Sequence, residues 1–205
     1  PVESSPPPAI DLGTLPTGAM FMRILGVNYV RLRPGDDGDL YVTEHGLPFW
    51  RQLDPANWYE RGWFNEHRVR LEGSGTVYRV PTRPLVDRSR RPRSIDLVVK
   101  WSRVGEDVPL DTFTLQRAIS AEFNTPFEEF SLLESLRRGE HGSESLRILT
   151  QKPLAIYVPP ERMQLWQTGR SASKVMGKIR RHPAVEIDIL RSYIMLYGWI
   201  DGPNV

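Results

Sequence analysis

The sequence predicts an α+β protein, in which a twisted antiparallel sheet of about five strands carries one packed helix and follows a β-rich extension. Three observations lead to this fold class. Short runs rich in β-branched and aromatic residues recur between turns that contain Gly and Pro, as in antiparallel sheets. Residues 126–138 have the apolar spacing of an amphipathic helix. The length of 205 residues suits one domain with an extension.

Composition narrows the class of protein further. Hydrophobic residues make up 40% of the chain and charged residues 25%, as in ordinary folded domains. The absence of cysteine excludes disulfides and thiol catalysis. No apolar run approaches the roughly 18 to 20 residues of a membrane span, and a net charge of +2 does not by itself indicate nucleic acid. We therefore expect a cytoplasmic protein without a membrane partner.

Residues 1–65 form the predicted extension. A Pro-rich lead at 1–9 is expected to be extended. Residues 27–33 alternate between apolar and polar, as in a half-buried strand. Residues 34–39 are rich in Pro, Gly and Asp, which favour a turn, and 40–43 predict a second strand. These two segments predict a β-hairpin.

Aromatic residues are concentrated between positions 48 and 64. Such rings can stack on bases or bind carbohydrate, but they more often pin an irregular segment to a domain. We favour packing. The six aromatic residues are Phe49, Trp50, Trp58, Tyr59, Trp63 and Phe64.

Two strands are expected at 67–71 and 76–80, on either side of Gly73-Ser74-Gly75. Glycines at this spacing permit a tight turn and let the backbone approach a ligand closely. Successive N–H groups in such a turn suit anionic oxygens, although a plain hairpin turn gives the same pattern. The Pro- and Arg-rich residues 81–94 predict an exposed loop. A buried strand at 95–101 then ends near Lys100.

The second half of the chain is expected to add one long helix and several further elements. Pro126 can open this helix at its first turn, and a core-facing stripe follows at every third residue. The stripe consists of Phe127, Phe130, Leu133 and Leu136. The further elements are a helix at Thr112–Phe123, strands at Leu146–Leu149 and Leu154–Val158, a mixed helical insertion at Pro160–Arg181 and a central strand at Ile187–Ile200.

Four segments of residues 66–205 follow one another in an order that resembles the small lobe of eukaryotic-type protein kinases. Gly73–Val80 resembles the glycine-rich loop, without its usual third glycine. The other three segments resemble the third-strand Val-Ala-Ile-Lys motif, the C-helix, and the fifth strand with the adenine-binding hinge; they are Val98–Lys100, Phe127–Arg137 and Tyr193–Gly202.

The resemblance implies the ATP-binding small lobe of a bacterial serine/threonine protein kinase-like protein, a phosphotransferase. Lys100 would hold the ATP phosphates and Glu129 would orient Lys100, as the catalytic pair. Glu128 and Glu134 are the alternatives to Glu129, with Glu128 the nearer rival. The remaining implied roles are phosphate cover by Gly73, Ser74 and Gly75, adenine cover by Val80 and Val98, and backbone contact with adenine at Leu196, Tyr197 and Gly198.

The motifs that perform phosphoryl transfer do not occur in the sequence. His-Arg-Asp and Asp-Phe-Gly are both absent from the 205 residues, and these motifs bring the catalytic Asp and the magnesium ligand. Because the chain starts at Pro1 and stops after a hinge-like segment, we expect a piece of a longer protein. Its partners would be a nucleotide, a C-terminal kinase lobe that supplies magnesium, and a protein substrate.

Two other function classes stay open. A non-enzymatic pseudokinase-type module would present the aromatic extension or the arginines between 83 and 93 to a partner. A nucleic-acid-binding β domain using the same features is less favoured, since exposed arginines often belong to a solvated loop. The histidines show no metal spacing with one another or with nearby carboxylates, so no metal site is predicted; they are His45, His67, His141 and His182.

Overall fold

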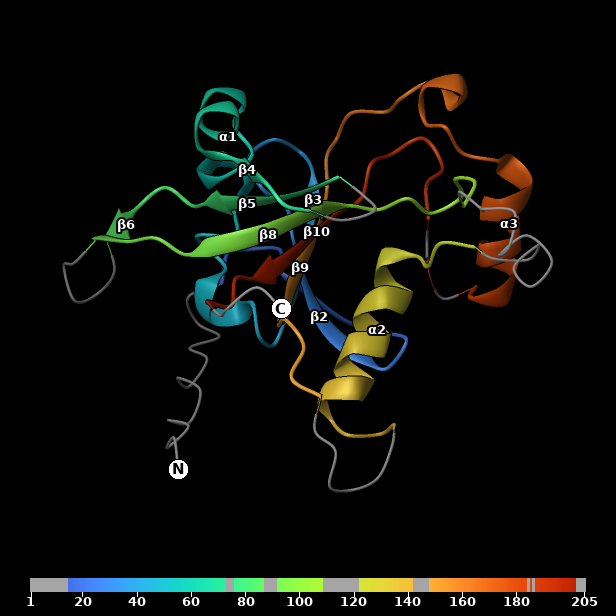
Figure 1. Cartoon of the computed structure of the whole chain (residues 1–205), viewed down its shortest axis with the longest axis horizontal. Helices are drawn as coiled ribbons and strands as arrows, with labels where there is room; N and C mark the ends of the chain where they lie inside the picture. The colour runs from blue at the N-terminus through green and yellow to red at the C-terminus, as the bar shows by residue number, and fades with distance from the viewer. Residues whose placement is uncertain are drawn as a thin grey trace.

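A computed structural model describes residues 15–72, 76–86, 92–108, 122–141, 148–183, 185 and 187–201. Its centre is an eight-stranded sheet with the strand order β1-β2-β3-β9-β10-β8-β5-β4, and every neighbouring pair is antiparallel. Strands β6 and β7 form a separate small sheet (Figure 1). The predicted α+β class and the antiparallel sheet are confirmed, but the sheet is larger than the expected five strands.

The bounds of the elements are as follows. The strands are β1 (Met20–Ile24), β2 (Val27–Leu32), β3 (Asp39–Thr43), β4 (Val69–Arg70), β5 (Val77–Pro81), β6 (Leu85–Val86), β7 (Pro92–Arg93), β8 (Asp96–Trp101), β9 (Pro153–Val158) and β10 (Ile194–Gly198). The helices are α1 (Arg61–His67), α2 (Pro126–Arg137) and α3 (Ala172–Arg181), with short 3-10 turns at η2 (Leu47–Phe49), η3 (Pro55–Asn57) and η4 (Leu165–Gln167).

The predicted extension is part of the large sheet. The expected hairpin is present as β2 and β3, and β3 pairs with β9, so strands from before and after residue 65 share one sheet. An ion pair across this junction joins Asp39 Oδ2 to Arg191 Nη1 at 2.8 Å. Arg31 Nη2 lies 2.7 Å from the other oxygen of the same carboxylate. Nothing in the sequence analysis predicted β1.

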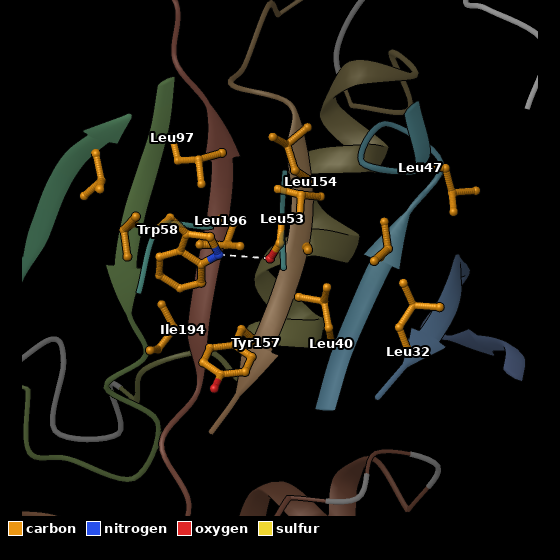
Figure 2. Close-up of a cluster of buried hydrophobic side chains, with 14 of the residues drawn as sticks. Leu32, Leu40, Leu47, Leu53, Trp58, Leu97, Leu154, Tyr157, Ile194 and Leu196 are labelled. Atoms are coloured by element: carbon orange, nitrogen blue, oxygen red, sulfur yellow. Dashed lines mark hydrogen bonds between the residues drawn. The ribbon is translucent and has the colours of Figure 1, made fainter. Parts of the chain in front are cut away.

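One face of the sheet is covered by residues 47–64. Trp58 is fully buried, and its indole N–H donates to the carbonyl of Leu53 at 2.9 Å. Phe64 packs in the same cluster, beside Leu97 and Leu196 from the strands. Figure 2 shows Trp58 lying across the strands that carry Leu97, Ile194 and Leu196. The packing interpretation of the aromatic segment is therefore confirmed for Trp58 and Phe64.

The opposite face carries α2. Phe127 and Phe130 of α2 are buried against Val98 and Tyr197 from the sheet. The helix begins where the sequence predicts, because the Thr125 hydroxyl accepts the N–H of Glu128 while the Glu128 carboxylate accepts the N–H of Thr125. This reciprocal pair satisfies two N–H groups at the helix start that have no partner within the helix.

Several predicted elements differ from the structure. The strand expected at 67–71 is reduced to β4, because His67 still belongs to α1. The strand expected at 187–200 is limited to β10. The insertion expected at 160–181 contains the 3-10 turn η4 and the helix α3. The remaining two predictions lie largely outside the described residues: the helix at 112–123 is described only at 122–123, and the strand at 146–149 only at 148–149, which are not strand.

We expect Trp58→Ala to lower the free energy of unfolding by about 3–5 kcal/mol, because it leaves a large cavity against the sheet. Urea denaturation followed by circular dichroism measures this change. Trp166→Ala is the matched control, since Trp166 is 80% exposed and its loss should change stability by less than about 0.5 kcal/mol. Equal effects of the two substitutions would contradict the packing described for residues 47–64.

Candidate functional site

The site is built on β8 and α2. Side chains alternate along β8, so Leu97 and Val99 enter the core under residues 47–64 while Val98 faces α2. Lys100, two residues after Val98, faces α2 as well. The capped start of α2 then sets the position of Glu129, one turn into the helix.

Lys100 and Glu129 form the ion pair that the kinase resemblance implies. Lys100 Nζ lies 2.6 Å from Glu129 Oε1, with side-chain exposures of 37% for the lysine and 24% for the glutamate. The ammonium is therefore held at one side and open to solvent at the other. The predicted alternatives to Glu129 are engaged elsewhere, as described below.

Tyr197 supports the same carboxylate. Its hydroxyl donates to Glu129 Oε1 at 2.6 Å, from the neighbouring strand β10. Burial raises the pKa of Tyr197, and the charge of Glu129 raises it further, so the phenol stays neutral and acts as a donor. The oxygen that faces Lys100 thus has two donors from two strands.

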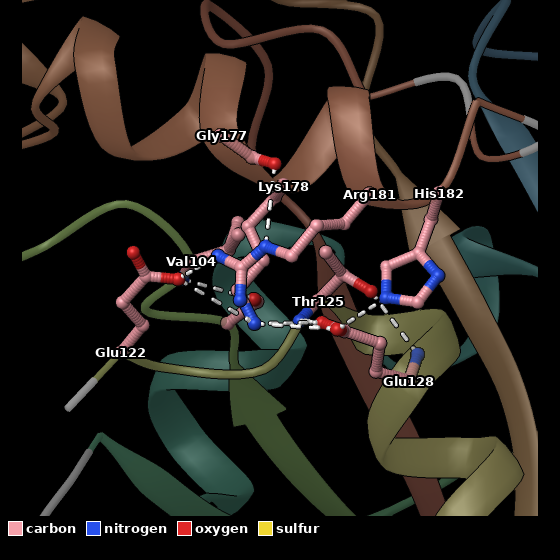
Figure 3. Close-up of polar contacts among 9 residues, drawn as sticks. Val104, Glu122, Thr125, Glu128, Gly177, Lys178, Arg181 and His182 are labelled. Atoms are coloured by element: carbon pink, nitrogen blue, oxygen red, sulfur yellow. Dashed lines mark hydrogen bonds and ion pairs between the residues drawn. The ribbon is translucent and has the colours of Figure 1, made fainter. Parts of the chain in front are cut away.

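Glu128 points to α3 rather than to Lys100. Lys178 is only 5% exposed, and its Nζ lies 3.1 Å from Glu128 Oε2, while His182 Nε2 lies 2.9 Å from Oε1. Figure 3 shows these groups meeting between α3 and the start of α2, with Glu122 and Arg181 alongside. Burial acts to raise the pKa of Glu128, but the hydrogen bonds from Thr125 and Lys178 outweigh it, and the pKa lies below its ordinary value. This network fastens α3 to α2.

Val80, predicted to cover adenine, does not share a face of the sheet with Lys100, and the Leu196 side chain lies on the same face as Val80. Val80 pairs with Leu97, and both are buried in the core on the face opposite Lys100. Leu196 lies in that same core. The reason is the pairing register, since residues directly opposite in an antiparallel pair share a face. Val80 and the Leu196 side chain therefore do not line a surface together with Lys100.

The backbone of Tyr197 and Gly198 is paired with neighbouring segments of the protein. Tyr197 lies between β8 and β9, opposite Val98 on one side. The N–H of Gly198 donates to the carbonyl of Lys152 at 3.0 Å, and the N–H of Trp199 to that of Asp96 at 3.1 Å. The N–H groups of Gly198 and Trp199 are therefore already paired within the protein. Gly73, Ser74 and Gly75 lie outside the described residues.

A cation–π contact that the sequence analysis missed lies beside Val98. Arg79 pairs with Val98 in register, and its guanidinium lies 4.5 Å from the centre of the Trp199 ring. Asp96 holds the same guanidinium in an ion pair. Val98 is 4% exposed. The contact depends on the register between β5 and β8, so no local sequence pattern indicates it.

The arginine-rich loop is described only in part, since residues 87–91 lie outside the described residues. At its start, Arg83 Nη2 lies 2.8 Å from the Glu60 carboxylate and its guanidinium lies over the Trp63 ring at 5.3 Å. Arg83 therefore contacts the aromatic segment.

Comparison of the chain with protein-family models, with curated proteins and with solved structures finds no match in any of the three. Among the described residues, no helix is both long and apolar enough to cross a membrane. The geometry of the site is therefore the basis for assigning a function.

We expect a double-mutant cycle with Lys100→Met and Glu129→Gln to give a coupling energy of about 1 kcal/mol or more, because the pair is half-buried and shares a donor from Tyr197. Chemical denaturation of the four proteins measures it. The matched control is Lys174 with Asp107, whose carboxylate is 91% exposed; exposed pairs couple by roughly 0.2–1 kcal/mol, and we expect the lower end there. A coupling no larger at Lys100–Glu129 than at the control would count against a structural ion pair.

Proposed function

We propose that this chain is a nucleotide-binding small lobe of the protein-kinase type, in which Lys100 holds the phosphates of ATP. The observation that carries the proposal is the contact of 2.6 Å between Lys100 on β8 and Glu129 on α2. In protein kinases the phosphate-binding lysine lies on the third strand and pairs with a glutamate of the C-helix. The pair here has the same two partners in the same kinds of element.

The order of elements supports the proposal. After residue 66 the elements of the large sheet and its helix follow in the order β4, β5, β8, α2, β9 and β10. Lys100 thus lies on the third of these strands. The connection between β4 and β5 contains Gly73 and Gly75, so the glycines precede the lysine strand as they do in a kinase.

The chemistry of the site suits a phosphate. The Lys100 ammonium has three donors, of which Glu129 uses one. The others are available to non-bridging phosphate oxygens, for which lysine provides a point charge. Glu129 and Tyr197 keep this ammonium in place before a ligand arrives, which lowers the ordering cost of binding.

Phosphoryl transfer itself is not assigned to these 205 residues. They contain neither His-Arg-Asp nor Asp-Phe-Gly, so the catalytic base and the magnesium ligand would have to come from a large lobe. The proposed partners are accordingly MgATP and such a lobe.

A second candidate function is a non-enzymatic interaction module of the pseudokinase type. The observation that favours it is the contact of Arg79 with Trp199 beside the buried Val98. In a nucleotide-binding lobe Val98 would form part of the adenine wall. Here Val98 is only 4% exposed and lies in the cluster that contains Phe127 and Phe130 of α2 and Trp199, so entry of adenine requires some of these side chains to move.

A titration of the chain with MgATP, measured by isothermal calorimetry, separates the two functions. We expect binding by the wild type and a loss of about 10- to 100-fold with Lys100→Met, which is the value of a charge-assisted hydrogen bond of roughly 1.5–3 kcal/mol. Lys174→Met should leave the affinity unchanged, because Lys174 on α3 pairs with the exposed carboxylate of Asp107, away from Glu129.

Arg79→Ala completes this experiment. If Arg79 only shields an adenine wall, its removal should leave MgATP binding intact or strengthen it. Absence of MgATP binding in both the wild type and Arg79→Ala would contradict the nucleotide proposal and favour the interaction module.

A further inference from the structure

Three side chains able to bind a metal meet beside α2. Glu44 and His45 belong to the turn between β3 and η2, and Glu134 belongs to the second half of α2. One ligand atom from each lies within 4.8 Å of the others. Glu44 and His45 are neighbours in sequence while Glu134 is distant, so spacing along the chain does not reveal the cluster.

The central atoms of this cluster lack hydrogen bonds. His45 Nε2 and Glu134 Oε1 lie 3.0 Å apart, and the Glu134 side chain is only 9% exposed. Neither atom has a hydrogen-bond partner in the part of the chain that the structure describes, and both are shielded from solvent. A buried polar atom without a partner costs about 1–3 kcal/mol, and more when it is charged. The cluster therefore needs a further group to satisfy it.

Tyr29 belongs to the same surroundings. Its hydroxyl is also buried without a hydrogen-bond partner, so that three of the four such side-chain atoms among the described residues belong to Tyr29, His45 and Glu134. Burial raises the pKa of Tyr29, and the negative charge of Glu134 raises it further. Unsatisfied polar atoms are thus gathered around Glu134 rather than scattered over the protein.

The turn that carries Glu44 and His45 is held firmly. The hydroxyl of Thr43, just before it, donates to the carbonyl of Pro153 at 2.6 Å. At Gly46, just after it, a Cβ would lie 2.1 Å from the carbonyl oxygen of Leu154, so only glycine fits against β9. The ligands on this turn are therefore positioned before any ion binds, as a metal site requires.

We propose that Glu44, His45 and Glu134 bind a divalent transition-metal ion, Zn²⁺ in the first instance. Imidazole with two carboxylates is a donor set that suits zinc and not magnesium. Two ligands about 2.0–2.1 Å from a tetrahedral zinc are roughly 3.3 Å apart, close to the 3.0 Å between His45 Nε2 and Glu134 Oε1. The two atoms lie at ion-pair distance, but neither has a hydrogen-bond partner among the described residues.

Three protein ligands leave one zinc position for water or for an anionic group. A pocket of about 470 Å³ is lined by Glu44 of the cluster and by Tyr29, whose buried hydroxyl has no partner among the described residues. An incoming ligand can therefore reach the ion from this pocket. The ion would also join the turn after β3 to α2, so it should stabilise the fold. This proposal does not depend on nucleotide binding at Lys100.

The test uses the whole chain, freed of metal with a chelator and then titrated with Zn²⁺ by isothermal calorimetry and thermal unfolding. We expect one Zn²⁺ per chain, a rise in Tm, and much weaker binding of Mg²⁺. His45→Ala should weaken Zn²⁺ binding by more than about 100-fold, beyond the loss typical of residues that only support a ligand. Glu44→Gln, at an exposed position, should weaken it without affecting folding.

His182→Ala is the matched control, because His182 also contacts a glutamate, at 2.9 Å, but outside the cluster. It should leave Zn²⁺ binding unchanged. The proposal is overturned if the metal-free wild type binds no Zn²⁺, or if His45→Ala and Glu44→Gln bind it as tightly as the wild type. In the first case His45 and Glu134 form only an ion pair, and in the second the ion binds elsewhere.

Discussion

The position of Lys100 on β8 is the constraint around which the rest of the structure is organised. The preceding residues of this strand, Leu97 to Val99, are buried on both faces of the sheet. Because only 37% of the Lys100 side chain is exposed, its ammonium has lost part of its contact with water and needs a carboxylate beside it to offset that loss. Glu129 meets this requirement only if α2 lies over β8 and β10, and the side chains of Phe127 and Phe130 hold it there. Tyr197 then donates to the same oxygen and completes the arrangement.

Helix α2 consequently serves three sites at once. In its first turn Glu128 contacts Lys178 of α3 and Glu129 contacts Lys100, and in its second half Glu134 lies beside His45. If Zn²⁺ binds at Glu134, the ion fixes the helix that carries Glu129. Metal binding and the orientation of Lys100 are then linked through one rigid element, without any contact between the two sites.

The sequence predicts those features that depend on local pattern. The helix at 126–138 and the strand at 95–101 are both present with nearly the expected bounds. The pairing of Lys100 with Glu129 was implied by the resemblance to the kinase small lobe, with Glu128 and Glu134 left as alternatives. The face of the sheet on which each side chain lies was harder to predict, because a shift of one residue in the pairing register moves a side chain to the other face. This is why Val80, expected to cover adenine, lies in the core, while Arg79 pairs with Val98 on the face that carries Lys100. The cluster of Glu44, His45 and Glu134 and the joining of β3 to β9 both depend on contacts between distant segments, which no window of sequence contains.

The most direct test of the central claim is a crystal structure of the chain with a non-hydrolysable ATP analogue and Mg²⁺. The account predicts phosphate oxygens within hydrogen-bond distance of Lys100 Nζ, the Lys100–Glu129 contact intact, and the Arg79–Trp199 contact displaced from Val98. A structure in which the analogue binds away from Lys100, or in which Lys100 turns away from Glu129, would contradict it.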